Sequence, residues 1–425
     1  MNVLVLGSGG REHAIAWKIS QSPDVNKIYV FPGNAGIEID AELEKVSEKV
    51  IKNSQDILHF AIENNIEITV VGPEKYLVDG IVDDFKKNGL KIIGPTKEAA
   101  KLEGSKSEAK LFMTRNNIET AQYELFNESV KAIAYAKNCR FPLVIKADGL
   151  ASGKGVFIVK SFDEAKKTII DLIDLKILGD AGKKILIEEF INGKEVSFIV
   201  LTDGISIFPF PICQDYKKLN VGDLGPNTGG MGAYSPVDFV NNELSDKIIK
   251  DVIVPVVRGM ENEGTPYSGF LYAGLIITPD GKIKVLEFNC RLGDPEAQVL
   301  MMLVKGDLYK LFHEMSNKNL HKYNSNNDFW YQESAMTVVA ASEGYPSNPK
   351  LDKLIKLPEI KKNDKNLKIF HSGTTAINGK LLTSGGRVLS VTARGKNKKE
   401  VRFKVYEQLR KISFPGIYFR SDINI

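Results

Sequence analysis

The chain has 425 residues, of which 43% are hydrophobic and 26% charged, a composition typical of a globular protein with more than one domain. Its formal net charge is only +4, and its Lys and Arg residues are spread along the chain, so we expect no nucleic-acid partner. No apolar stretch approaches the roughly 18 residues of a membrane span, and no secretory signal precedes the first strand, so we expect no membrane partner. The three cysteines match neither a metal-binding pattern nor a disulfide framework. Together these features lead us to expect a cytoplasmic protein.

Strand and helix patterns alternate over the first part of the chain, up to residue 103. The predicted strands are VLVLG (3–7), KIYVF (27–31), IEITVVG (66–72) and LKIIG (90–94), with helical patterns between them. This alternation predicts a parallel α/β sheet, so we expect a Rossmann-like domain over residues 1–103. Each strand runs into a loop rich in Gly or Pro, and parallel sheets bind ligands at this edge.

The loop after the first strand, GSGGRE, has two of the three glycines of a dinucleotide-binding turn. The third glycine position is occupied by Glu12, and no acidic residue ends the second strand, where such sites bind the ribose. NAD is therefore disfavoured. A glycine-rich turn before a helix N-terminus still favours a phosphate, and Arg11 and His13 add donors.

The next part of the chain begins with a helical pattern, SKSEAKLFMTRNN, and continues as FPLVIKADGLASGKGVFIVK. GLASGKG is not a P-loop, because its first two glycines are one residue too close and a strand follows it. We interpret the segment as a hairpin with Lys154 at its tip and Lys146 on the strand before it. Small residues let a backbone approach phosphates, and two ammonium groups balance their charge. A mobile hairpin without a ligand is the alternative.

Two further strands follow in ILIEEFINGKEVSF, which carries Glu188 and Glu195 beside a turn. A strand end of this kind can bond an adenine edge, and a carboxylate can take ribose hydroxyls. The segment VGDLGPNTGGMGAYSP (221–236) is too poor in apolar residues to predict a core element. A helical pattern and strand FLYAGLIIT precede the next motif.

KVLEFNCRLGDPEAQ places Glu287 and Asn289 two residues apart on a predicted strand, so both side chains face the same side. A carboxylate and an amide oxygen suit Mg²⁺, which takes few protein ligands and completes its shell with water and phosphates. Arg291 and Asp294 follow within reach of the same spot. The polar run 316–328 is predicted to be a linker, and the final hundred residues are rich in strand patterns.

The lysine-bearing hairpin, the carboxylates near the turn and the Glu-x-Asn strand, in this order, resemble the ATP-grasp ligases. GSGGREHA, GPNTGGMGAYSP, RLGDPEAQ, FHSGTT and TSGGRVLSVTARG narrow the resemblance to the phosphoribosylamine–glycine ligase family, from residue 1 to about 420. The resemblance implies a multidomain α/β and α+β fold. It would comprise the Rossmann-like domain, an ATP-grasp domain at 104–327 with a lid at about 121–190, and a strand-rich domain at 328–425.

The resemblance also implies a reaction, the ATP-dependent ligation of glycine to 5-phosphoribosylamine through glycyl phosphate. Its products would be glycinamide ribonucleotide, ADP and phosphate, in de novo purine biosynthesis. The expected partners are small-molecule substrates only. We expect a monomer that uses Mg²⁺ or Mn²⁺ as its cofactor.

The same resemblance implies roles for individual residues. Those expected to bind ATP are Lys106, Lys146, Lys154, Glu188, Phe190 and Glu195, and those expected to bind the metal are Glu287 and Asn289. Those expected to bind phosphoribosylamine are Gly9, Gly10, Arg11, Glu12, Asn34, Gly72, Pro73 and Glu74. Arg291, Lys154 and Asp294 are the expected catalytic residues, with Arg291 steadying the glycyl phosphate. Either Asp215 or Asp294 would hold the glycine ammonium group.

Overall fold

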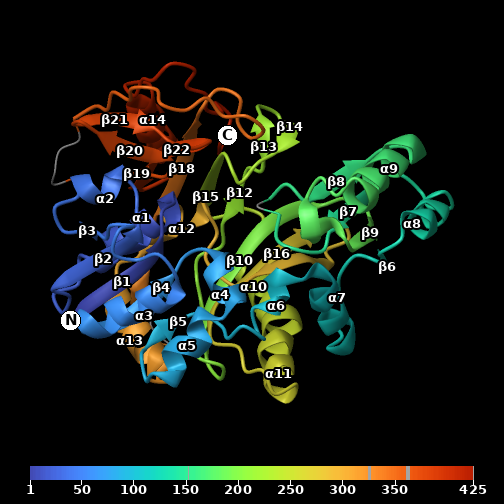
Figure 1. Cartoon of the computed structure of the whole chain (residues 1–425), viewed down its shortest axis with the longest axis horizontal. Coiled ribbons are helices and arrows are strands. Elements are labelled where there is room, and N and C mark those ends of the chain that lie inside the picture. The colour runs from blue at the N-terminus through green and yellow to red at the C-terminus, as the bar shows by residue number, and fades with distance from the viewer. Residues whose placement is uncertain (152, 324–326, 360–363, 425) are drawn as a thin grey trace.

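The computed structural model describes residues 1–151, 153–323, 327–359 and 364–424. In Figure 1 the N-terminal sheet (blue) lies beside the C-terminal sheet (red), and a smaller unit (green and teal) projects on the opposite side. The prediction of a multidomain α/β and α+β fold is confirmed by this arrangement of sheets. Within the described ranges, no helix has both the length and the apolar character needed to cross a bilayer.

The N-terminal sheet has the order β3-β2-β1-β4-β5, and every neighbouring pair is parallel, as predicted. Its strands are β1 (Asn2–Gly7), β2 (Lys27–Pro32), β3 (Glu44–Lys45), β4 (Ile66–Val71) and β5 (Ile92–Ile93). The helices are α1 (Gly10–Ile19), α2 (Ala35–Ile39), α3 (Ser54–Glu63), α4 (Glu74–Asp79) and α5 (Ile81–Lys87). The central strand β1 is an unbroken apolar run because both of its faces are buried.

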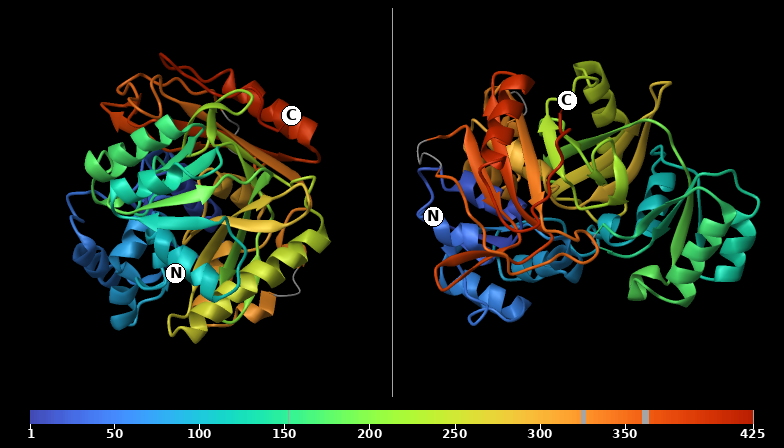
Figure 2. Two further views of the ribbon diagram at one scale, coloured as in Figure 1. Left: turned by 90° about the vertical axis from the view of Figure 1, so that its right-hand side faces the viewer. Right: turned by 90° about the horizontal axis from the view of Figure 1, so that it is seen from above.

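Helices α6 (Lys101–Gly104) and α7 (Lys106–Arg115) lead into the projecting unit, which we define as residues 123–189. Figures 1 and 2 show this unit standing off from the rest of the chain. It contains β6 (Tyr123–Phe126), α8 (Ser129–Ala136), β7 (Leu143–Ala147), β8 (Val156–Val159), α9 (Phe162–Ile169), η1 (Ile170–Asp174), η2 (Gly179–Gly182) and β9 (Ile185–Glu189). The antiparallel order is β6-β9-β7-β8, and the sheet and helices enclose a small core of their own.

A second antiparallel sheet, β11-β10-β16-β17, carries the Glu-x-Asn motif on its edge strand. Its strands are β10 (Lys194–Thr202), β11 (Ile207–Pro209), β16 (Gly269–Ile277) and β17 (Ile283–Asn289). The helices of this part of the chain are α10 (Asn242–Ile248), η3 (Ile249–Ile253), α11 (Val254–Asn262), α12 (Glu296–Leu303), α13 (Leu308–Ser316), η4 (Leu320–Tyr323) and η5 (Asn327–Phe329). The pairing of β16 with β17 skips Leu286, so a bulge directly precedes Glu287. Such a bulge redirects the side chains that follow it.

The C-terminal sheet has the order β12-β15-β18-β22-β19. Its strands are β12 (Gln214–Asp215), β15 (Gly232–Ser235), β18 (Ser334–Ala341), β19 (Leu367–His371) and β22 (Arg387–Gly395), and α14 (Lys398–Leu409) packs on it. Two separate hairpins are β13 (Lys218–Asn220) with β14 (Leu224–Asn227), and β20 (Thr374–Ile377) with β21 (Lys380–Thr383).

One prediction about this region was wrong. Residues 221–236 were expected to lack a core element, yet β15 is buried along its whole length between β12 and β18. Its small residues allow this, since a Cβ on Gly232 would lie 2.7 Å from the Thr337 carbonyl oxygen. The backbones approach closely at Gly232, and the Tyr234 side chain of the same strand belongs to the hydrophobic core. Strands β12 and β15, which precede residue 240, therefore belong to the same sheet as the strands of the final hundred residues.

A buried polar cluster joins the N-terminal and C-terminal sheets. His13 on α1 accepts a hydrogen bond at Nδ1 from the backbone N–H of His371 (3.0 Å), so its Nε2 carries the proton and donates to Asp40 (3.0 Å). Lys368 donates to both oxygens of Asp40. Burial lowers the pKa of His13, which favours this neutral form. His13 thus faces the C-terminal sheet rather than the glycine-rich loop.

Candidate active site

A pocket with an empty volume of about 770 Å³ opens between the projecting unit, α7 and β17. Seven of the residues predicted to act on a ligand line it, namely Glu74, Lys106, Lys146, Glu188, Glu287, Asn289 and Arg291. Gly153 and Gly155, at the tip of the β7–β8 hairpin, line it as well. Lys154 between them is exposed and is absent from the lining, as are Phe190 and Glu195. The pocket therefore gathers residues from the N-terminal sheet, the projecting unit and β17.

At one end of the pocket, Glu188 lies between two lysines, with Lys146 Nζ at 2.8 Å and Lys110 Nζ at 3.3 Å. Lys110 also donates to Thr120 Oγ1 at 2.6 Å. Burial lowers the pKa of Lys110 to about 8, although Glu188 opposes this shift. Glu188 Oε1 has no well-oriented hydrogen-bond donor among the described residues, so it can accept one from a ligand. Lys110 was not predicted from the sequence, although its spacing of four from Lys106 puts both on one face of α7.

At the other end, Glu287 is surrounded by cations. Its burial alone would raise its pKa, but Lys217, Lys146, Lys106 and Arg291 together hold the pKa below its usual value, so the carboxylate is ionised. Asn289 Oδ1 accepts a hydrogen bond from Arg291 Nη2 at 3.2 Å.

This donor set fits a metal that takes few protein ligands. No group of three His, Cys, Asp or Glu residues that could hold a metal occurs in the described part of the chain. Glu287 and Asn289 are an ionised carboxylate and an amide oxygen, which are hard ligands suited to Mg²⁺ or Mn²⁺. Such an ion would draw its remaining ligands from water and phosphates.

Arg291 is the centre of a charged network that connects the pocket with the N-terminal sheet. Its Nη2 lies 2.8 Å from Glu103 Oε1, and its Nε donates to Glu74 Oε2 at 3.3 Å. Glu103 Oε2 in turn accepts from the backbone N–H of Cys290 at 2.7 Å. Burial raises the pKa of Glu103, whereas Arg291 and Arg11 outweigh burial and lower the pKa of Glu74. Glu103 was not predicted, because no nearby motif marks it.

The glycine-rich loop is held mainly by Glu12, which had been predicted to bind substrate. Its Oε2 accepts from the Gly9 N–H at 2.6 Å, and its Oε1 lies 2.6 Å from Arg11 Nε. Gly72 leaves room for this carboxylate, because a Cβ there would lie 1.9 Å from Glu12 Oε1. Asn34 caps α2 through its Oδ1 and donates to the backbone oxygens of Ser8 and His371.

The remaining predicted residues of this region lie at the same edge of the sheet. Gly9 precedes α1, Gly10 begins it, and Pro73 directly precedes Glu74, the first residue of α4. The structure thus brings the loops after β1 and β4 to the side of the pocket where Arg291 lies.

The two aspartates considered for the glycine ammonium group occupy different surroundings. Asp294 accepts from Gln298 Nε2 at 2.9 Å and from the Arg11 N–H at 3.4 Å, and lies 3.5 Å from Arg387 Nη1. Burial would raise its pKa, but Arg387 and Arg11 lower it. Asp215 is at the end of β12, where burial raises its pKa to about 7 against the opposing effect of Lys217.

Lys217 is a further residue that the sequence analysis missed. Its Nζ lies 3.3 Å from Glu195 Oε2, and its charge is among those that lower the pKa of Glu287. Burial would lower the pKa of Lys217, but Asp215 and Glu195 raise it, so it remains a cation. Its place two residues after Asp215 on an extended segment was the available signal.

Family models for the N, ATP-grasp (A) and C domains of phosphoribosylglycinamide synthetase match residues 1–103, 104–297 and 335–424. Phosphoribosylamine–glycine ligases of Vibrio parahaemolyticus and Pseudomonas aeruginosa are 45% and 46% identical to this chain, over 100% of this chain and 97% of each relative. A crystal structure of phosphoribosylamine–glycine ligase from Thermotoga maritima has a TM-score of 0.84 at 35% identity, covering 99% of this chain and 100% of that chain.

The biotin carboxylase domain of 2-oxoglutarate carboxylase from Hydrogenobacter thermophilus has a TM-score of 0.75 at 15% identity, covering 98% of this chain and 91% of that chain. This more distant likeness shows the fold alone. The three family models together cover most of the chain in the order in which its sheets occur. The chain therefore belongs to the phosphoribosylamine–glycine ligase family, whose members are ATP-grasp enzymes.

Proposed function

We propose that the chain ligates glycine to 5-phosphoribosylamine through a glycyl phosphate intermediate, giving glycinamide ribonucleotide, ADP and phosphate in de novo purine biosynthesis. The observation that carries this proposal is the Glu74–Arg291–Glu103 network, which joins the pocket of Glu287 and Asn289 to the loops of the N-terminal sheet. A reaction that activates one substrate with ATP and transfers it to a phosphate-bearing amine requires two such adjacent sites. Family membership supports the same reaction.

ATP would occupy the pocket with its adenine towards Glu188. Glu188 Oε1 can accept a hydrogen bond from the 6-amino group of the base, and Lys106 and Lys146 would neutralise the phosphates. Phe190 and Glu195 lie just beyond β9 and on β10, where we assign them to the base and the ribose. Lys154 is exposed at the hairpin tip and would reach the phosphates when the hairpin closes over them.

Glu287 and Asn289 would hold Mg²⁺ or Mn²⁺, which would neutralise the charge of the bound phosphates when present. In the first step, an oxygen of the glycine carboxylate attacks the γ-phosphorus and ADP leaves. Arg291 and Lys217 are the cations placed to offset the charge that develops on the transferred group. In the second step, the amine nitrogen of phosphoribosylamine attacks the acyl carbon, phosphate leaves, and the nitrogen loses a proton.

Between the two aspartates, we assign the glycine ammonium group to Asp215. Asp294 already accepts from Gln298 and Arg11 and pairs with Arg387, so its charge is compensated without a ligand. Burial raises the pKa of Asp215 to about 7, so a bound cation would favour its ionised form. Asp294 would then act by fixing the N-terminus of α1 beside the pocket.

Phosphoribosylamine would place its phosphate near the N-terminus of α1, beside Gly9 and Gly10 and within reach of the Arg11 side chain. Glu12, Asn34, Gly72 and Pro73 would shape this site through the contacts described above, and Glu74 would face the ribose. In this arrangement the amine would point towards Arg291.

Further features of the chain are proposals of the same kind. We propose domains at 1–103, 104–327 with the lid at 121–190, and 328–425, and a cytoplasmic monomer that has only small-molecule partners. Sedimentation equilibrium at several concentrations would test the monomer, because a concentration-dependent mass would contradict it.

The test of the proposed function is ADP formation with ATP, Mg²⁺ and freshly generated phosphoribosylamine, with and without glycine. We expect ADP release that depends on both glycine and phosphoribosylamine and matches amide product one to one. ADP release that ignores glycine, or that requires bicarbonate instead, would contradict the proposed substrates.

A further inference from the structure

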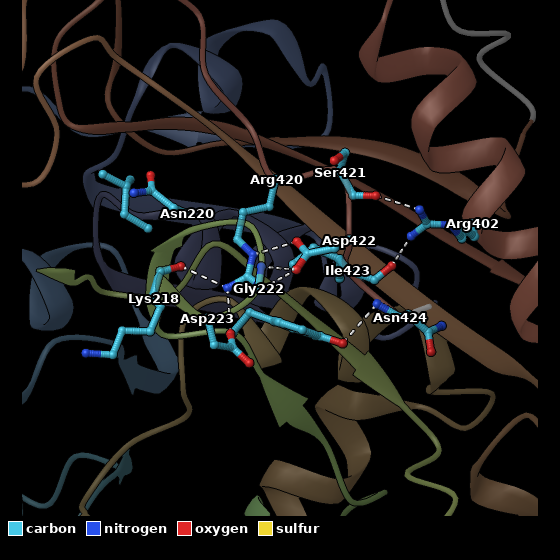
Figure 3. A network of polar contacts seen from close by, with 12 residues as sticks. Lys218, Asn220, Gly222, Asp223, Arg402, Arg420, Ser421, Asp422, Ile423 and Asn424 are labelled. Carbon is cyan, nitrogen blue, oxygen red and sulfur yellow. Dashed lines mark hydrogen bonds and ion pairs between the residues drawn. The ribbon is translucent and has the colours of Figure 1, made fainter. Parts of the chain in front are cut away.

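Residues 418–424 form hydrogen bonds with the β13–β14 hairpin, and Figure 3 shows the part of this network around Arg420. At its centre lies Arg420, which is wholly buried. The Arg420 Nη1 donates to Asp223 Oδ1 at 2.8 Å and to the Lys218 carbonyl oxygen at 3.0 Å. Its Nε and Nη2 donate to the two oxygens of Asp422 at 2.8 and 2.6 Å. Two of these four hydrogen bonds reach the hairpin, and the other two hold Asp422, which belongs to the same segment as Arg420.

Other contacts tie the same two segments together. The Gly222 N–H donates to Asp422 Oδ2 at 2.9 Å, and Tyr418 OH donates to the Leu219 carbonyl oxygen at 3.1 Å. Among the residues that the structure describes, β13 and β14 pair only with each other, so the hairpin joins no larger sheet there. An isolated two-stranded hairpin is marginally stable in water. The hydrogen bonds from residues 418–424 therefore stabilise a hairpin that would be only marginally stable by itself.

The hairpin is directly continuous with the segment that carries Asp215 and Lys217. Tyr216 faces Arg420, whose guanidinium carbon lies 4.7 Å from the centroid of the Tyr216 ring, and Tyr216 OH accepts from the Asn424 N–H at 3.1 Å. Because successive side chains of an extended segment point to opposite faces, Asp215 and Lys217 face the other way. The Lys217 Nζ accordingly lies 3.3 Å from Glu195.

The far end of the hairpin returns to the same place. Thr228 donates from both its N–H (2.7 Å) and its Oγ1 (2.8 Å) to the Lys217 carbonyl oxygen. The backbone of Lys217 is therefore fixed on one side by Thr228 and through the adjacent Lys218 carbonyl by Arg420. Both anchors depend on the hairpin keeping its position.

We infer that Arg420 is a positioning residue for Lys217, acting from the rear face of the segment that places Lys217 beside Glu195. The inference rests on the proposed function, in which Lys217 offsets charge on the transferred phosphoryl group. Arg420 touches no substrate. Its role is to hold the hairpin, so that Lys217 and Asp215 keep the geometry the reaction needs, and small displacements of such groups are costly.

The experiment compares Arg420→Met with wild-type protein by steady-state kinetics and by amide hydrogen exchange. We expect kcat to fall by about 10- to 100-fold. The KM for ATP should change much less than kcat, because Lys106, Lys146 and Glu188 lie elsewhere and only Glu195 among the proposed ATP ligands contacts Lys217. Exchange should become faster across residues 216–228 and stay unchanged across 185–189. Arg420→Lys, which keeps the charge but loses the forked geometry, should recover only part of kcat.

Arg394→Met is the matched control. Arg394 is also nearly buried in the C-terminal sheet, but its polar side-chain contacts are with Glu333 and Asn366. We expect a comparable loss of thermal stability with unchanged kcat and unchanged exchange at 216–228. Asp223→Asn removes the charge that Arg420 contacts on the hairpin, so it should reproduce part of the Arg420→Met effect.

The inference is overturned if Arg420→Met keeps wild-type kcat, if exchange at 216–228 does not change, or if Arg394→Met lowers kcat equally. Failure of the proposed function is a separate result, since wild-type protein would then show no glycine-dependent ADP release. In that case exchange at 216–228 still decides whether Arg420 holds the segment that carries Lys217.

Discussion

The packing of Glu12 against Gly72 leads to a quantitative prediction for Gly72→Ala. A Cβ at position 72 would lie 1.9 Å from Glu12 Oε1 and 2.5 Å from its Cδ, so the carboxylate must leave its site. The backbone of Gly72 does not have a positive φ, so alanine introduces no backbone strain of its own. The substitution therefore acts only by displacing Glu12.

The magnitude follows from the two contacts that Glu12 would lose. Its bond from the Gly9 N–H caps α1, and losing a cap of this kind costs about 1 kcal/mol. Its contact with Arg11 is a charged hydrogen bond between side chains that are 2% and 10% exposed, and such a bond contributes about 1.5–3 kcal/mol. Together we expect Gly72→Ala to lower the free energy of unfolding by about 2.5–4 kcal/mol. Glu12→Ala should cost a similar amount, because it removes the same two contacts.

The assay is a double-mutant cycle measured by urea unfolding. The chain has two tryptophans, and Trp17 lies on α1, so its fluorescence reports on the helix that Glu12 caps. With Glu12 already replaced by alanine, Gly72→Ala has nothing to displace. We expect the double variant to resemble Glu12→Ala, with a coupling energy of about 2 kcal/mol or more. If Gly72→Ala cost the same with and without Glu12, the packing argument would be refuted.

Three further predictions concern charged groups. Glu287→Gln should lower turnover by about 100-fold or more while the fold is kept, because it removes a proposed metal ligand; turnover near the wild-type value across a Mg²⁺ titration would contradict the assignment. Lys110→Met should raise the KM for ATP by about tenfold through the loss of the Glu188 contact, whereas Lys131→Met, at an exposed ion pair, should leave it unchanged; equal KM values would rule this role out. His13 and Lys368 outweigh the burial of Asp40 and lower its pKa from the usual 3.8 to about 2. The ionised carboxylate therefore stabilises the fold fully above pH 3.8, and this stabilisation is lost as the pH falls through 2. Asp40→Asn should therefore cost up to about 2 kcal/mol at neutral pH and progressively less between about pH 4 and pH 2, and a pH-independent difference in urea unfolding would show that this linkage is absent.

Local sequence patterns were sufficient for much of the fold. The alternation of strand and helix signals predicted the parallel N-terminal sheet, because strands buried on both faces must be apolar throughout. The spacing of two residues placed Glu287 and Asn289 on one face of a strand, and both line the pocket. In each case a few neighbouring residues carry the whole signal.

Strand β15 shows where this reasoning fails. Its residues, GAYS, include a single aromatic side chain, and a prediction based on runs of apolar side chains finds no core there. The strand is nevertheless buried because β18 approaches its backbone closely at Gly232. Small residues can mark either an exposed loop or a tight contact, and only the neighbouring strand distinguishes the two.

The sequence by itself determined the order of the strands and helices and the residue types available at each loop. Tertiary structure decided which of these meet. Glu103 acquires its role from Cys290 and Arg291, which lie almost two hundred residues further along the chain, and Arg420 acquires its own from the β13–β14 hairpin. Periodicity indicates which face of an element is buried, but not which distant element covers it. That choice depends on how whole layers pack, and it is there that the charged network of the active site is assembled.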